Sequence, residues 1–101
     1  MKRMDCTAIL KALSEMTRMR IMRLLLKDTL NINDIADKLG MSQYNVSRHI
    51  RILREAHLVD TEKRGKHRFC TVPSQLRARL ASSKNVLRFE CCTFYFDKLP
   101  K

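Results

Sequence analysis

The chain has 101 residues, a length typical of one small domain, and we predict that residues 1–101 form a single domain. Its 21 lysine and arginine residues outnumber 10 aspartate and glutamate residues, so the net charge of +11 favours a polyanionic partner such as nucleic acid. No apolar run approaches the roughly 20 residues of a membrane span, and the N-terminus is a poor signal peptide. These features predict a cytoplasmic protein without a membrane partner.

Apolar residues at helical spacing predict three helices in the first 40 residues. These residues are Ile9, Leu10 and Leu13, then Ile21, Leu24 and Leu25, then Ile32, Ile35, Ala36 and Leu39. Thr17 is the expected cap of the second helix. Gly40 follows the third helix, where a residue just past a helix end often adopts a left-handed backbone.

Residues 35–50, IADKLGMSQYNVSRHI, have the layout of a helix-turn-helix, with a small Ala36 at the helix crossing and Gly40 in the turn. Ser42 is the predicted cap of the second of these helices, and the buried stripe is Val46, Ile50 and Leu53. The side chains predicted to contact DNA are Ser42, Gln43, Tyr44, Ser47, Arg48, His49 and Arg51. Glutamine pairs well with adenine and arginine with guanine, whereas the alternative is a helical hairpin with a solvated polar face.

A β-hairpin with a basic tip is predicted directly after this helix, in the segment EKRGKHRF at residues 62–69. Its basic residues are Lys63, Arg64, Lys66, His67 and Arg68. A hairpin in this position makes the predicted fold a winged helix-turn-helix, mainly α with one β-hairpin, and its cations would contact phosphates or enter the minor groove. The alternative is an ordinary turn that carries basic residues.

The last third of the chain predicts one more helix, which Pro73 opens and which runs through Leu76 and Leu80. A cysteine-bearing segment follows at about 84–101. Its residues 84–96 are rich in β-branched and aromatic side chains, and both helix and strand stay open for them.

Two long motifs resemble the ArsR–SmtB family of metal- and metalloid-sensing repressors. LKALSEMTRMRIMRLLL is similar to the family's opening helices, and MSQYNVSRHIRILREAHLV is similar to its DNA-reading helix, so the resemblance covers about residues 8–72. His57 stands where the family usually has glycine at the end of that helix. The resemblance implies a homodimer joined through its first and last helices and bound to double-stranded operator DNA with an inverted repeat.

The usual metal sites of the family are missing from this sequence. Asn31 and Asn33 stand where the resemblance would place the thiolates of arsenic-responsive members. The three histidines, His49, His57 and His67, all lie in the predicted DNA-facing half, so the zinc site that the family builds on its last helix is not expected either. Cys91 and Cys92 are then the remaining sensor-like cluster.

Soft thiolates at Cys91 and Cys92 would select As(III), Sb(III), Hg(II), Cd(II) or Cu(I). As(III) prefers three thiolates, and Cys6 or Cys70 is the possible third ligand. Reduced thiols are the expectation, and the chain must bend at Glu90–Cys92 for both thiols to reach one ion. Two alternatives stay open: core packing between aromatic residues, and a disulfide that joins Cys91 or Cys92 to Cys6 or Cys70.

The sequence therefore predicts a dimeric repressor that needs no cofactor to bind DNA and leaves its operator when a thiophilic ion binds, with As(III) favoured. The first alternative is a repressor of the same fold that senses thiol oxidation or reactive sulfur. A non-specific architectural DNA-binding protein is less expected, because Gln43, Tyr44 and Ser47 suit base reading. No catalytic carboxylate pair, nucleophile–base pair or phosphate loop is apparent, so no enzyme is expected.

Overall fold

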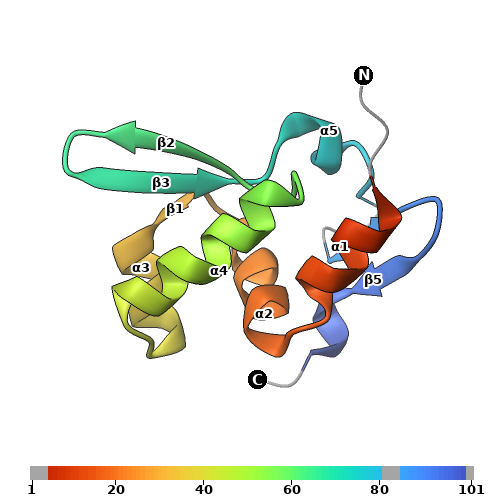
Figure 1. Ribbon diagram of the computed structural model, residues 1–101, viewed down its shortest axis with the longest axis horizontal. Coiled ribbons are helices and arrows are strands. Elements are labelled where there is room, and N and C mark those ends of the chain that lie inside the picture. The colour runs from red at the N-terminus through yellow and green to blue at the C-terminus, as the bar shows by residue number, and fades with distance from the viewer. Residues whose placement is uncertain (1–4, 81–84, 100–101) are drawn as a thin grey trace.

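The computed structural model describes residues 5–80 and 85–99, and four helices form its first half (Figure 1). They are α1 (Cys6–Leu13), α2 (Met16–Leu25), α3 (Ile32–Leu39) and α4 (Gln43–Glu55). A three-stranded antiparallel sheet has the order β1–β3–β2 and consists of β1 (Leu30–Asn31), β2 (Asp60–Arg64) and β3 (His67–Thr71). The chain ends with α5 (Ser74–Arg77), β4 (Val86–Arg88), β5 (Thr93–Tyr95) and the 3-10 helix η1 (Phe96–Lys98). The fold is the predicted winged helix-turn-helix.

Side-chain caps set the starts of the DNA-side helices. The hydroxyl of Ser42 accepts a hydrogen bond from the Asn45 N–H at 3.1 Å, which confirms the predicted start of α4. Gly40 ends α3 with a φ of 63°, the left-handed backbone that was expected there. The prediction for α2 was wrong: Glu15 is the cap, because its carboxylate accepts hydrogen bonds from the N–H groups of the first turn, and Thr17 lies inside the helix.

The core lies where α1, α2 and α4 cross and continues under the C-terminal segment. Ile21 and Leu25 of α2 are fully buried together with the predicted stripe of α4, which is Val46, Ile50 and Leu53. Leu10 differs from the prediction, since 46% of it is exposed and Ala12 takes the inward position on α1. The periodicity of α1 is helical, but its buried face is rotated by one or two residues.

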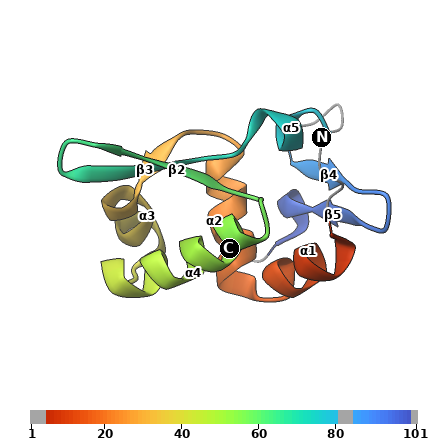
Figure 2. The same cartoon turned by 45° about the horizontal axis from the view of Figure 1, so that its top comes forward.

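The wing is the hairpin of β2 and β3, which extends away from the helices in both views (Figures 1 and 2). Gly65 and Lys66 form its turn, and Gly65 has a φ of 62°, which favours glycine there. Arg64 pairs with His67 next to the turn. The short strand β1 completes the sheet by pairing with β3 and was not predicted.

The predicted last helix is much shorter than expected, because α5 has four residues. The chain beyond it joins a second sheet: the Arg88 N–H donates to the Arg79 carbonyl at 3.1 Å, and Leu80 forms a β-bridge with Leu87. Pairing with β4 thus replaces further helical turns. Residues 81–84 and 100–101, which include the first and last positions of the predicted cysteine-bearing segment, lie outside the described residues.

The described part of the C-terminal segment is an antiparallel β-hairpin of β4 and β5, which settles the question of helix or strand. Phe89–Cys92 connect the two strands, and the Phe89 N–H donates to the Cys92 carbonyl at 2.8 Å across the loop. Leu87 and Phe96 are fully buried, so one face of the hairpin and η1 adds to the core. Figures 1 and 2 both place β5 beside α1, at the end of the molecule away from the wing.

Candidate nucleic-acid interface and cysteine cluster

The polar face of α4 points away from the core because the buried stripe holds the opposite face against α2 and α3. Exposed residues on α4 and at its cap include six of the seven predicted DNA contacts: Ser42, Gln43, Tyr44, Ser47, Arg48 and Arg51. Tyr44 is 73% exposed, and the guanidinium of Arg48 lies 5.9 Å from the centre of its ring. An aromatic ring of this size, exposed beside an arginine, is available to an external partner.

Two adjacent hollows separate this face from the wing. The larger, of about 340 Å³, is lined by Ile32, Tyr44, Ser47, Arg48, Ile50, Arg51, Arg54, Thr61 and Arg68. The smaller, of about 190 Å³, is lined by Ile32, Asn33, Gln43, Ser47, Lys66, His67 and Arg68. The structure therefore brings the predicted helix residues and part of the predicted wing into one basic surface, here called the α4–wing surface.

Arg54 and Thr61 belong to this surface but were missed by the sequence reasoning. Arg54 follows Arg51 by three positions and Ser47 by seven, a helical spacing that signals one face of α4. Arg54 and Arg68 both donate to the Thr61 hydroxyl, at 3.3 Å and 3.2 Å, so Thr61 links α4 to the wing. This link holds the wing at a defined position beside the helix.

The wing tip carries four more of the predicted residues in exposed positions: Lys63, Arg64, Lys66 and His67. Arg64 forms an ion pair with Glu62 at 3.0 Å, and its guanidinium lies 5.0 Å from the centre of the Phe69 ring. Both groups of this ion pair are mostly exposed, so the pair contributes little to stability and leaves Arg64 accessible.

His49 does not lie on the α4–wing surface, in contrast to the prediction. Its Nδ1 atom lies 3.7 Å from a carboxylate oxygen of Glu15 and 3.3 Å from the guanidinium of Arg18, and its side chain is 23% exposed. Partial burial acts to raise the pKa of the Glu15 carboxyl. Two effects outweigh it and lower this pKa below its usual value: hydrogen bonds from the N–H groups of Thr17 and Arg18, and the nearby His49 ring. His49 thus joins α4 to the start of α2.

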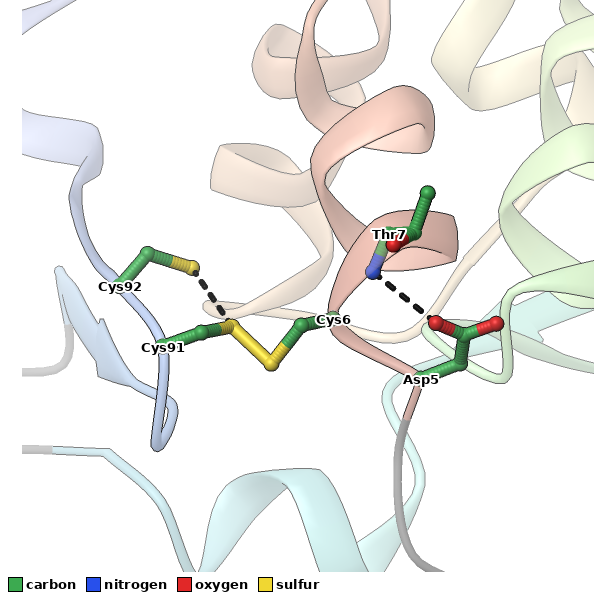
Figure 3. Close-up of a disulfide and its surroundings, with 5 residues drawn as sticks. All are labelled: Asp5, Cys6, Thr7, Cys91 and Cys92. Atoms are coloured by element: carbon green, nitrogen blue, oxygen red, sulfur yellow. Dashed lines mark hydrogen bonds between the residues drawn. A yellow bond between two sulfur atoms is a disulfide. The ribbon is translucent and has the colours of Figure 1, made fainter.

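The structure joins Cys6 and Cys91 in a disulfide, with the two Cα atoms 6.2 Å apart (Figure 3). Cys6 is the first residue of α1, where Asp5 caps the helix by accepting a hydrogen bond from the Thr7 N–H at 3.0 Å. The expectation of four reduced thiols was therefore wrong, and one of the disulfides left open by the sequence is present. Packing of the C-terminal hairpin beside α1 brings these two cysteines together, although they are 85 positions apart.

Cys92 completes a cluster of three sulfur atoms, because its Sγ atom lies 3.6 Å from that of Cys91 (Figure 3). The chain bends at Glu90 and Cys91, as the sequence argument required for two neighbouring thiols to lie together. Burial raises the pKa of the Cys92 thiol. Cys6, Cys91 and Cys92 are referred to below as the cysteine cluster.

Cys70 lies elsewhere, fully buried in β3 between its pairing partners Leu30 and Thr61. Burial raises the pKa of its thiol to about 11, although Arg68 acts in the opposite direction. Of the two possible third ligands, the structure thus places Cys6, and not Cys70, against Cys91. With Cys6 and Cys91 bonded to each other, residues 5–80 and 85–99 contain no group of three His, Cys, Asp or Glu side chains able to hold a metal ion.

Comparison with known proteins places this fold in a family. Residues 15–61 match the family model described as bacterial regulatory protein, arsR family. The solved structure of HlyU from Vibrio cholerae N16961 is 30% identical, with a TM-score of 0.65 over 71% of this chain and 79% of that chain. The chain belongs to the ArsR family. The family match ends before the C-terminal hairpin and begins after Cys6, so it does not extend to the cysteine cluster.

Relatives with similar sequences, HlyU again among them, differ in the direction of regulation. The transcriptional activator HlyU of Vibrio cholerae is 33% identical over 66 residues, and the transcriptional repressor SdpR of Bacillus subtilis strain 168 is 31% identical over 58 residues. The matches cover 65% and 57% of this chain, and 61% and 64% of those relatives. The homodimeric winged helix-turn-helix DNA-binding domain Mb0332 from Mycobacterium bovis is 25% identical, with a TM-score of 0.67 over 72% of this chain and 68% of that domain.

No helix in the described parts of the chain is both long and apolar enough to span a membrane.

Proposed function

We propose that the protein is a transcriptional repressor that binds double-stranded operator DNA. The observation that carries this proposal is the α4–wing surface, where Arg48, Arg51, Arg54 and Arg68 line one hollow. An α-helix with exposed glutamine, tyrosine and arginine fits the major groove, and a basic hairpin beside it reaches the adjacent phosphates. The resemblance to metalloid-sensing repressors favours repression over activation.

We propose that the operator-bound form is a homodimer on an inverted repeat. One recognition helix and one wing supply few contacts, whereas a dimer makes on the order of 6–10 phosphate contacts and reads half-sites about 34 Å apart. Because α5 is a single turn, we assign the dimer contact to α1 and the C-terminal hairpin. In support, Leu10 on α1 and Tyr95 on β5 are large hydrophobic residues that remain about half exposed.

Binding of the protein to its own upstream DNA tests the first proposal. Gln43→Ala should weaken binding to the matched operator by about 1–3 kcal/mol and change binding to a scrambled duplex much less. Arg64→Ala on the wing should weaken binding to the matched operator and to the scrambled duplex by similar factors, and it should reduce the salt dependence of binding. Lys27→Ala is the matched control, since it removes an exposed cation that lies outside both the α4–wing surface and the assigned dimer contact. Equal effects of Lys27→Ala and Arg64→Ala would contradict the assigned interface.

We propose that a thiophilic ion acting at Cys91 and Cys92, with Cys6 as the third ligand, releases the repressor. Once the disulfide is reduced, three thiols remain at the junction of α1 and the C-terminal hairpin, and As(III) prefers three thiolates. Sb(III), Hg(II) and Cd(II) are further candidates. Drawing the three sulfur atoms onto one ion would re-pack the hairpin against α1, the contact assigned to the dimer, and change the spacing of the two recognition helices.

The disulfide itself favours a second candidate, in which oxidation is the signal. The thiols of Cys6 and Cys91 would give up two protons and two electrons to a peroxide, which is reduced to water and alcohol or to two waters, and form the bond present in the structure. Disulfides in reducing compartments are mostly transient and regulatory, which fits a switch of this kind.

One titration separates the two candidates. Reduced protein on fluorescent operator DNA is treated without oxygen with As(III), Hg(II) or Cd(II), and in parallel with hydrogen peroxide. Cys92→Ser should abolish release by As(III) and leave release by peroxide intact, because Cys92 is not part of the disulfide. Cys6→Ser should abolish both responses. Release of the Cys6→Ser/Cys91→Ser/Cys92→Ser variant at the same ion concentration would place the sensor elsewhere, without affecting the DNA-binding proposal.

A further inference from the structure

A third hollow, of about 630 Å³, lies between α2, α3 and the C-terminal hairpin. It is lined by Arg20, Arg23, Leu24, Lys27, Lys38, Leu39, Asn85 and Asp97. None of these residues lines the α4–wing surface. Four of the eight are cations and one is an acid, so the hollow is a basic site that DNA reading through α4 does not use.

Arg20 contributes a donor that lacks an acceptor. Its Nε atom is buried and has no hydrogen-bond partner among the described residues. Buried donors are nearly always paired, because an unpaired one loses its water without replacement. Arg23 beside it donates from one terminal nitrogen to the Leu99 carbonyl at 3.4 Å, which holds its guanidinium against the C-terminal segment and leaves its other donors for a ligand.

The spacing of the cations concentrates their charge. Arg20, Arg23 and Lys27 are three and four positions apart, so they follow one side of α2 and its end. Like charges at this spacing destabilise a helix, and Lys38 from the last turn of α3 adds a fourth charge to the same hollow. Asp97 is the one carboxylate among the described lining residues, and a single negative charge cannot neutralise four positive ones. An anion in the hollow would relieve this repulsion.

We propose that this hollow binds a small phosphorylated molecule. The planar guanidinium groups of Arg20 and Arg23 suit the oxygen atoms of a phosphate, and Lys27 and Lys38 suit a second anionic group on the same ligand. The volume is within the range of small-molecule sites, about 300–1,000 Å³. Asp97 favours a small molecule over a nucleic-acid backbone, because its carboxylate repels a continuous run of phosphates and accepts hydrogen bonds from hydroxyl groups.

The far wall of the hollow belongs to the hairpin that carries the cysteine cluster. Asn85 precedes β4 and Asp97 lies in η1. The Phe96 N–H donates to the Asn85 carbonyl at 2.7 Å, so the two lining residues of this wall belong to one hydrogen-bonded unit. A ligand that contacts α2, α3 and this unit would hold the hairpin against the helices. The site is thus placed to influence the same hairpin as Cys91 and Cys92.

The test uses inorganic diphosphate as the probe and amide NMR shifts at constant ionic strength as the readout. Shifts should concentrate at residues 20–27, 38–39, 85 and 97. Lys27→Gln/Lys38→Gln changes two exposed side chains and should weaken binding by about tenfold or more. Lys63→Gln/Lys66→Gln, the matched control, removes two exposed wing lysines and should leave the affinity at this hollow unchanged.

Three results would overturn the proposal. The first is a set of shifts confined to α4 and the wing. The second is an equal loss of affinity in both double variants, which would indicate general attraction by the net charge of +11. The third is a duplex DNA fragment that shifts the same residues more strongly than diphosphate, which would make the hollow a nucleic-acid contact.

Discussion

The bond between Cys6 and Cys91 should make the stability of this protein strongly dependent on its redox state. The two cysteines are 85 positions apart, so the bond closes a loop that contains most of the chain. Closing a loop of this length removes conformational entropy from the unfolded chain worth about 4–5 kcal/mol near room temperature. Small domains have a free energy of unfolding of about 5–15 kcal/mol, so reduction should remove a large fraction of it.

Urea unfolding of the oxidised and the reduced protein, followed by circular dichroism, measures this difference. A free-thiol count in denaturant verifies the two states, because the chain has four cysteines and Cys70 and Cys92 remain free in the oxidised form. The reduced protein should unfold at a urea concentration lower by about 2–4 M. Cys6→Ser should unfold like the reduced wild type and lose its response to reductant.

Cys92→Ser is the matched control, since it removes the neighbouring thiol and leaves the bond in place. Cys92→Ser should retain the full difference in urea midpoint between oxidised and reduced protein. The same urea midpoint for oxidised and reduced wild type would contradict this prediction, because a loop of 85 positions cannot be opened without an effect on the unfolded chain. A reductant effect that survives in Cys6→Ser would show that another cysteine pair is responsible.

Three further predictions concern single residues. Burial raises the pKa of Cys70 from about 9 to about 11, so the folded state holds this proton more tightly than the unfolded chain does. This difference contributes about 2–3 kcal/mol to the free energy of unfolding below pH 9, and the contribution should be lost as the pH rises from 9 to 11. Urea titrations of Cys70→Val should show a smaller change of stability over the same pH range. His57→Gly should raise the free energy of unfolding by about 0.5–1 kcal/mol, because His57 has a φ of 63°; a loss of stability would mean that its side chain matters more than its backbone. Glu15→Ala should lower the free energy of unfolding by about 1 kcal/mol at neutral pH, because it removes the cap of α2. Since the pKa of Glu15 is lowered in the folded state, the difference in stability between wild type and variant should shrink as the pH falls below 4.5. A difference that stays constant with pH would exclude the carboxylate charge as its source.

Elements whose geometry depends on neighbouring residues could be predicted from the sequence. The start of α4 at Ser42, the left-handed turn at Gly40 and the wing turn at Gly65 each follow from local backbone chemistry, which a sequence displays directly. The apolar stripe of α4 fixed the direction of its polar face, so most predicted DNA contacts lie on one exposed surface.

Tertiary packing decided the position of single side chains. His49 lies beside Glu15 because α2 crosses α4 at that level, and helical spacing alone does not reveal which neighbour covers a flank of a helix. Arg54 joined the α4–wing surface through Thr61, which is on another element. Packing also buried the Nε atom of Arg20, which has no hydrogen-bond partner among the described residues.

The conformation of the segment that carries Cys91 and Cys92 depends on long-range packing, so it could not be predicted from the sequence. The preference of a segment for β structure depends on the surface it packs against, and here Leu80 and Arg79 supply pairing partners that end α5 and start the hairpin. That hairpin lies beside α1 and brings Cys91 to Cys6 across 85 positions, while Cys70 is kept in the core of the wing sheet. The sequence singled out Cys91 and Cys92 and left Cys6 and Cys70 open as the third ligand. Long-range packing selected Cys6, because the distance between residues far apart in the chain is set by how the elements pack and not by local sequence.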